Sequence, residues 1–235
     1  MSNTIAQNIE NILSQITVLA QDADREPASV QLLAVSKTKP ISDVIQAYDA
    51  GQRHFGENYV QEGVEKVHAL AHLSDLVWHF IGPIQSNKSK FIAECFDWCH
   101  SIDRLKIAQR LNNQRAVDQK PLQVCIQVNI DNEVTKAGIT PEELPAIASQ
   151  IAQMPQLTLR GIMAIPKATS IITEQRDSFE RLAHLYQALQ TNFPDVDILS
   201  MGMSGDIGPA IEAGSTMVRV GTGIFGQRTP SPKKD

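Results

Sequence analysis

The chain has 235 residues, of which 42% are hydrophobic and 20% are charged, a composition typical of a globular protein with a filled core. Its 26 acidic and 21 basic side chains give a net charge of −5, which argues against a nucleic-acid or anionic-membrane surface. No apolar stretch approaches the length that spans a bilayer, and no basic leader precedes an apolar run at the start. We therefore expect a cytoplasmic protein without a nucleic-acid or membrane partner.

Cysteine and histidine spacings do not favour a metal or redox site. Cys95, Cys99 and Cys125 form an odd set without a pair at zinc or redox spacing, and we expect them to be reduced and mostly buried. His68 and His72 stand four residues apart on a predicted helix. Because no third ligand is nearby, they predict a solvated helix face rather than a metal site.

Helix and strand signals alternate along the first half of the chain. Apolar residues at spacings of four and three predict an amphipathic helix over residues 5–19, ahead of the first strand. We expect Ser42 or Asp43 to cap the second helix, and Ser101 or Asp103 to cap a later one. The other expected elements are the strand 31–36, the helix ending at 50, the strand 53–55, the helix 60–71, the strand 76–81, the helix 87–94, the strand 96–102 and the helix ending near 115.

The alternation continues in the second half. Apolar residues at every second position make 122–130 the clearest strand. A polar loop over 131–138 follows it, and Pro141 opens the next helix. Residues 229–235 should form a flexible C-terminal tail. The elements expected in between are the strand 157–164, the helix 173–192, the strand 197–201, the short helix 209–213 and the strand 216–220.

Eight strand signals that alternate with helix signals predict a single-domain (β/α)8 TIM barrel with an extra N-terminal helix. We expect this domain to comprise residues 1–228. A doubly wound open sheet is the alternative, because strand counts from one sequence are often off by one or two. The first strand is not followed by a glycine-rich dinucleotide fingerprint, which weakens that alternative.

Lys37 stands at the carboxyl end of the first predicted strand. In parallel α/β folds, ligands bind at this end of the strands. A lysine that is partly removed from water has a lowered pKa, so more of it is neutral amine that can attack an aldehyde and form an imine. The alternative is a lysine at the rim of the barrel with no role in binding.

Two glycine-containing turns follow the seventh and eighth predicted strands, at 200–206 and 221–223. Because the corresponding loops of TIM barrels often hold phosphate, the pair predicts a phosphate site; the alternative is two turns without such a use. An imine-forming lysine beside a phosphate site suggests pyridoxal 5'-phosphate as cofactor, since this molecule carries an aldehyde and a phosphate on one ring.

Six short motifs occur together in one order. They are VSKTKP at 35–40, HFGEN at 54–58, WHFIGPIQSNK at 78–88, RGIM at 160–163, MGMS at 201–204 and RVGT at 219–222. They resemble the pyridoxal phosphate homeostasis protein family, also called the YggS/PROSC family, and the similarity extends over residues 32–226. Members have the barrel of the alanine racemase N-terminal domain, bind pyridoxal phosphate and have no established enzymatic activity.

The resemblance implies roles for the residues that match the family's motifs. Lys37 would be the Schiff-base lysine, Asn58 would line the pocket beside the ring, and Arg219 would face the pyridine nitrogen. The phosphate would be held by Ser204, Gly221 and Thr222. The sequence departs from the family's pattern after the serine and after the threonine, at Gly205, Gly208, Pro209 and Gly223.

Arg219 favours a binding protein over an enzyme. A permanently charged arginine donates to an unprotonated pyridine nitrogen, which disfavours aminotransferase and decarboxylase chemistry. Racemases of this fold also use such an arginine, but they need a second acid/base, a tyrosine from an additional domain that we do not expect here. Tyr59 is the one tyrosine expected to approach the mouth. We therefore predict buffering or delivery of pyridoxal phosphate without catalytic residues; a weak pyridoxal-dependent amino-acid racemase is the alternative.

Other lysines suggest a further hypothesis about delivery. Lys39, Lys136, Lys233 and Lys234 could hold or hand over the aldehyde, although solubility is their default role. The expected partners are pyridoxal phosphate and the apo forms of enzymes that need it. We expect a monomer or a weak dimer.

Overall fold

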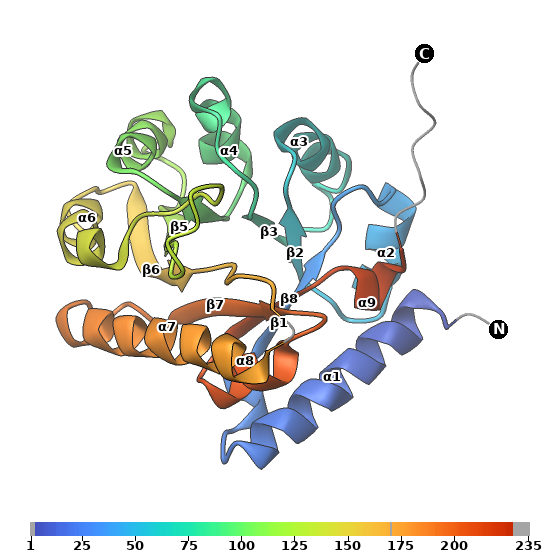
Figure 1. The fold of residues 1–235 in the computed structure, drawn as a ribbon. Helices are drawn as coiled ribbons and strands as arrows, with labels where there is room; N and C mark the ends of the chain where they lie inside the picture. Colours follow the sequence, from blue (N-terminus) through green and yellow to red (C-terminus); the bar gives the residue numbers. More distant parts are fainter. Residues whose placement is uncertain (1–2, 170, 228–235) are drawn as a thin grey trace.

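The apolar runs of the sequence become the strands of a closed barrel. The computed structural model describes residues 3–169 and 171–227, in which eight parallel strands follow one another in chain order and β8 pairs with β1 (Figure 1). The predicted TIM barrel is therefore confirmed, and the open sheet is wrong. The strands are β1 (Gln31–Val35), β2 (His54–Glu57), β3 (Val77–Phe80), β4 (Trp98–Ile102), β5 (Leu122–Gln127), β6 (Leu157–Met163), β7 (Ile198–Met203) and β8 (Met217–Val220).

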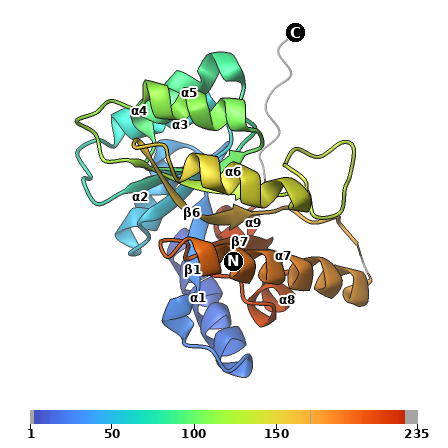
Figure 2. The same ribbon diagram turned by 90° about the vertical axis from the view of Figure 1, so that its left-hand side faces the viewer.

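Helices surround the sheet and return the chain between strands (Figures 1 and 2). The predicted N-terminal helix precedes the barrel and packs outside it, against the second, eighth and ninth helices. The helices are α1 (Ile5–Asp22), α2 (Ile41–Asp49), α3 (Val60–Ala69), α4 (Ser89–Cys95), α5 (Leu105–Gln114), α6 (Leu144–Ile151), α7 (Ile172–Asn192), α8 (Ile207–Glu212) and α9 (Thr222–Phe225), with 3₁₀ turns η1 (Pro27–Ser29), η2 (Ser86–Lys88) and η3 (Pro141–Glu143).

Each strand divides its side chains between the barrel interior and the layer under the helices, as a parallel sheet covered on both faces requires. On β5, Val124 and Ile126 belong to the outer layer, whereas Cys125 lies inside. Cys99 and Cys125 are fully buried thiols, as predicted, and burial raises the pKa of Cys99 to about 12. The interior apolar cluster consists of Leu33, Trp98, Cys125, Met163, Ile198 and Met217.

The predicted helix caps are wrong. Helix α2 begins directly after Pro40, and neither Ser42 nor Asp43 caps it. Helix α5 has no side-chain cap, so neither Ser101 nor Asp103 serves there. Ser101 lies inside β4 instead, where its buried hydroxyl donates to a carbonyl of the loop after β3 at 2.5 Å. A serine whose hydroxyl is used between neighbouring strands cannot also cap a helix.

Strand ends near the mouth differ from the predicted ones. β5 ends at Gln127, and the chain pairs again only through the bridge between Val128 and Ile139. β7 continues to Met203, two residues beyond its predicted end. Figure 2 shows the loop after β5 projecting at the same end of the barrel as the segment before α7. Helix α9 was not predicted, because four residues carry no hydrophobic period.

Within the two described ranges, no helix is both long enough and apolar enough to cross a membrane. The predicted tail, 229–235, lies outside the described residues together with Lys233 and Lys234. The domain boundary at 228 therefore stays a prediction.

Candidate functional site

Lys37 lies in the turn that directly follows β1, and it is half-buried. In the sheet, β1 has β8 on one side and β2 on the other: Ala34 pairs with Val220, and Val35 pairs with Gly56. The residues that follow β8 and β2 are therefore the nearest neighbours of the lysine turn around the mouth of the barrel.

Arg219 is held at the top of the barrel interior. It is 4% exposed, and its guanidinium donates to the Ser200 carbonyl at 2.7 Å, the Ser200 hydroxyl at 2.8 Å and the Ala164 carbonyl at 2.8 Å. Burial lowers the pKa of Arg219 to about 10, opposed by the Asp206 carboxylate. The side chain is thus a cation at neutral pH, fixed by Ser200 within β7 and by Ala164 just after β6.

The two predicted phosphate loops lie side by side. Ser204 follows β7, and α9 begins at Thr222, one residue after the end of β8. A Cβ at Gly223 would lie 3.7 Å from Ser204 Oγ, so the loops approach each other closely. Gly221 is packed against β1, since a Cβ there would lie 3.2 Å from the Val35 carbonyl oxygen. The turn thereby brings hydroxyl groups and the first N–H groups of α9 together beside the Lys37 strand.

Asn58 completes the arrangement on the other side of Lys37, just after β2. Its Oδ1 atom is buried and has no hydrogen-bond partner in the part of the chain that the structure describes. The backbone of Asn58 is pressed against Gly82, where a Cβ would lie 2.1 Å from the Asn58 carbonyl oxygen. The six predicted site residues thus come from four adjacent strands, β7, β8, β1 and β2.

A row of histidines inside the barrel was missed by the sequence interpretation. His54 Nδ1 lies 2.9 Å from His79 Nε2, and His79 Nδ1 lies 2.9 Å from His100 Nε2. His100 Nδ1 is buried without a partner among the described residues. Burial lowers the pKa of His100 to about 3, helped by the nearby Arg219 cation, and burial also lowers that of His79. The available signal was that His79 and His100 each interrupt a run of apolar residues in the middle of a strand.

Lys66 is the second missed residue. It is 3% exposed on α3, and it contacts Glu57 at the end of β2. The sequence interpretation placed this residue on the helix 60–71 and assigned it no role. Its ammonium also donates to the carbonyl of Ser36, the residue before Lys37, at 2.7 Å.

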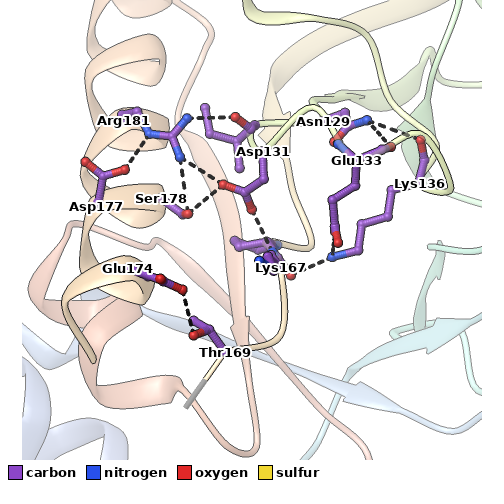
Figure 3. Close-up of polar contacts among 12 residues, drawn as sticks. Asn129, Asp131, Glu133, Lys136, Lys167, Thr169, Glu174, Asp177, Ser178 and Arg181 are labelled. Carbon is purple, nitrogen blue, oxygen red and sulfur yellow. Dashed lines mark hydrogen bonds and ion pairs between the residues drawn. The ribbon is translucent and has the colours of Figure 1, made fainter. Parts of the chain in front are cut away.

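A polar cluster holds the long mouth loop in place (Figure 3). The Asp131 carboxylate accepts from Ser178 Oγ at 2.7 Å, from Arg181 at 2.8 Å and from the Lys167 backbone N–H at 2.7 Å. Figure 3 shows the guanidinium of Arg181 between Asp131 and Asp177. An adjoining cavity of about 390 Å³ is lined by these side chains and by none of the six predicted site residues. The cluster fixes loops rather than the predicted site.

Two of the lysines considered for delivery are engaged. The Lys39 ammonium donates to the carbonyls of Phe225 at 2.7 Å and Gln227 at 3.0 Å. The Lys136 ammonium pairs with Glu133 and donates to the Pro166 carbonyl at 2.9 Å. A transfer role for either lysine would require these contacts to open.

Comparison with known proteins identifies relatives over nearly the whole chain. Residues 7–229 match the family model of the alanine racemase N-terminal domain. A pyridoxal phosphate homeostasis protein of Vibrio alginolyticus is 58% identical over 229 residues, covering 96% of this chain and 98% of that protein. The structure of PipY of Synechococcus elongatus with pyridoxal phosphate bound has 38% identity and a TM-score of 0.81, covering 95% of this chain and 100% of that chain.

A more distant likeness shows the fold alone. An alanine racemase of Clostridium difficile matches with a TM-score of 0.72 at 15% identity, covering 97% of this chain and 57% of that chain. By the family model and by the identity to its full-length relatives, this chain belongs to the alanine racemase N-terminal domain family, and within it to the pyridoxal phosphate homeostasis proteins.

Proposed function

We propose that this protein binds pyridoxal 5'-phosphate at the mouth of the barrel through Lys37 and takes part in homeostasis of this cofactor. The observation that carries the proposal is the gathering of Lys37, Arg219 and the loops of Ser204 and Gly221 on adjacent strands. The pyridoxal phosphate bound to PipY and the name of the Vibrio relative support it.

The residues present fit this ligand. Asn58 Oδ1 offers an unused hydrogen-bonding atom beside the lysine turn. The absence of a side chain at Gly221 lets the end of β8 lie against Val35, and the hydroxyls of Ser204 and Thr222 suit a phosphate. The Lys37 amine would attack the aldehyde carbon, and the carbonyl oxygen would leave as water when the C=N bond forms.

Arg219 supports binding rather than strong catalysis. A cationic guanidinium can donate to a ring nitrogen that carries no proton, but it cannot stabilise a protonated ring as a carboxylate does. Without that protonation the cofactor is a weaker electron sink, so we infer a carrier or buffer that has no strong activity.

A weak amino-acid racemase is the second candidate, because the fold is shared with alanine racemase. Tyr59 directly follows Asn58 in the sequence, at the N-cap of α3, and is 51% exposed. Exchange of an amino acid's α-hydrogen in deuterated water distinguishes the two: exchange that depends on both Lys37 and Tyr59 would favour the racemase.

The test of the proposal is the absorbance spectrum after pyridoxal phosphate is added. We expect the wild type to develop an imine band at ~420 nm that Lys37→Ala lacks, because the neutral lysine amine is the nucleophile. Borohydride reduction followed by peptide mapping should locate the adduct on Lys37.

Lys39→Ala is the matched control, since Lys39 lies two residues away and its ammonium is held by backbone carbonyls. We expect it to keep the band. An unchanged band in Lys37→Ala, or no band in the wild type, would show that the ligand or the residue is wrong.

Delivery to apo-enzymes, cytoplasmic localisation and a monomeric or weakly dimeric state belong to the same proposal. The relatives' role in cofactor homeostasis, as their name states it, supports a protein that must release what it binds. A reversible imine suits this purpose, because hydrolysis returns both the aldehyde and the amine.

A further inference from the structure

The ammonium of Lys66 makes three short contacts beneath the Lys37 turn. It donates to the Ser36 carbonyl, to Glu57 Oε1 and to Glu62 Oε1, each at 2.7 Å. Glu57 and Ser36 are fully buried, and Lys66 reaches them from α3. Three residues from β2 and α3, namely Glu57, Glu62 and Lys66, therefore form one connected charged cluster.

This cluster holds the chain on both sides of Lys37. On the N-terminal side, Lys66 binds the Ser36 carbonyl, and the Ser36 hydroxyl donates to Glu57 Oε1 at 2.6 Å. On the C-terminal side, Glu62 Oε1 accepts from the Thr38 N–H at 2.6 Å. The peptide groups before and after the predicted imine-forming residue are thus tied to the same three side chains.

The turn needs such support. Thr38 has a φ of +63°, in the left-handed region that a β-branched residue rarely adopts. Such a backbone conformation is strained and persists only where its surroundings determine it. The hydrogen bond from Thr38 to Glu62 fixes this conformation, and with it the direction in which Lys37 leaves the backbone.

Stability alone does not explain a charged cluster here. Removing ions from water is unfavourable, and apolar residues of similar size often stabilise a fold as well or better. Burial raises the pKa of Glu57, and the nearby Lys66 ammonium opposes this shift. The charged form of Glu57 is therefore disfavoured at this buried position even though it is paired. Glu57 Oε2 is buried without a partner among the described residues, which a purely structural carboxylate would avoid.

We propose that Glu57, Lys66 and Glu62 form a positioning cluster that presents the Lys37 amine to the aldehyde of the ligand. The inference rests on the proposed function, because it concerns the rate at which Lys37 reacts. The three residues act through the backbone of Lys37 and are positioning residues, not catalytic ones.

Glu62 provides the sharpest test, since its side chain is partly exposed and its replacement leaves the buried pair of Lys66 and Glu57 intact. We expect Glu62→Ala to slow imine formation at least about 10-fold, because misplacing a reacting group by ~1 Å can cost ~100-fold. Glu62→Gln should restore most of the rate, because its amide oxygen can still accept from Thr38. Stopped-flow absorbance after mixing with pyridoxal phosphate measures this rate.

A second readout separates positioning from general damage. Pyridoxine 5'-phosphate has the ring and the phosphate but no aldehyde, so calorimetric titration with it reports the pocket without the imine. We expect Glu62→Ala to bind it within about two-fold of wild type while imine formation is slow. Lys90→Met is the matched control, because Lys90 is an exposed lysine paired with Glu94 on α4; it should change neither quantity.

The outcomes are distinct. If Glu62→Ala and Glu62→Gln both react at the wild-type rate, or if Glu62→Ala loses rate and pyridoxine phosphate affinity to the same degree, the positioning role is wrong. If the wild type forms no imine at Lys37, the proposed function fails instead, and that result is seen before any variant of the cluster is made.

Discussion

Among single residues, Gly82 links the stability of the fold to the site. A Cβ at this position would lie 2.1 Å from the Asn58 carbonyl oxygen, which is backbone and cannot rotate away. We expect Gly82→Ala to lower the free energy of unfolding by about 3 kcal/mol, since the strand ends must separate to accept the methyl group. The variant should also bind pyridoxal phosphate less tightly, because Asn58 is displaced. Chemical denaturation and ligand titration measure the two effects.

Gly208→Ala is the control for this prediction. Gly208 lies in α8, and a Cβ there would be 3.5 Å from Leu19 Cδ2, an ordinary contact. We expect a change of less than ~1 kcal/mol, because the added methyl group meets no backbone atom; the mid-helix advantage of alanine over glycine is offset by the following Pro209. Equal losses in the two variants would mean that crowding at Asn58 is not the cause.

At the level of secondary-structure elements, the histidine row joins three strands and predicts an acid-sensitive core. In the register of the sheet, His54 pairs with Val77, and His79 lies two residues beyond Val77 on β3. In the same way, His79 pairs with Trp98, and His100 lies two residues beyond Trp98 on β4. Each histidine of the row is therefore closer to the mouth than the one before it. Each contact joins two ring nitrogens, one of which must accept, so at least one ring in each pair is neutral. The row is therefore a connected polar path through an otherwise apolar interior.

The sign of the pH effect follows from the lowered pKa values. Unfolded histidines bind protons below about pH 6.5, whereas the folded pKa of His100 is about 3, so the unfolded state gains protons as the pH falls. The contribution of a histidine that stays neutral in the folded protein to the free energy of unfolding is complete above about pH 6.5. It decreases by up to ~1.4 kcal/mol per pH unit as the pH falls below that value. We expect His100→Gln to have a shallower loss of unfolding free energy than wild type between those pH values.

Urea denaturation at several pH values provides the measurement. His184→Gln, which changes an exposed histidine on α7, is the control and should leave the wild-type slope unchanged. Parallel curves for wild type and His100→Gln would mean that His100 accepts a proton in the folded protein.

The elements themselves were predictable, but the interactions between them were not. Lys37 could be placed because a strand, a lysine and a proline follow one another in the sequence. His79 and His100 are 21 residues apart, and only the register of β3 with β4 brings them together. The burial of Lys66 depends on where α3 meets β1 and β2, which the local pattern around it does not record. Long-range register is absent from local periodicity.

For the whole molecule, the predicted ligand would connect the two ends of the described chain. Lys37 and Asn58 follow the first two strands, whereas Ser204, Gly221 and Thr222 follow the last two, and the barrel closes between β8 and β1. A ligand that contacts both groups opposes opening at that seam. At 100 times its dissociation constant it should add about 2.7 kcal/mol to the free energy of unfolding.

Hydrogen exchange tests where this stabilisation acts. We expect pyridoxal phosphate to slow amide exchange most in β1 and β8, because opening the seam exposes these strands first and the ligand bridges them. Strands β4 and β5 lie on the opposite side of the barrel and serve as the internal control, with a smaller change. Lys37→Ala should reduce the protection of β1 while β8, which keeps its phosphate contacts, retains more of it. Protection confined to β4 and β5 would place the ligand away from the seam and contradict the assigned site.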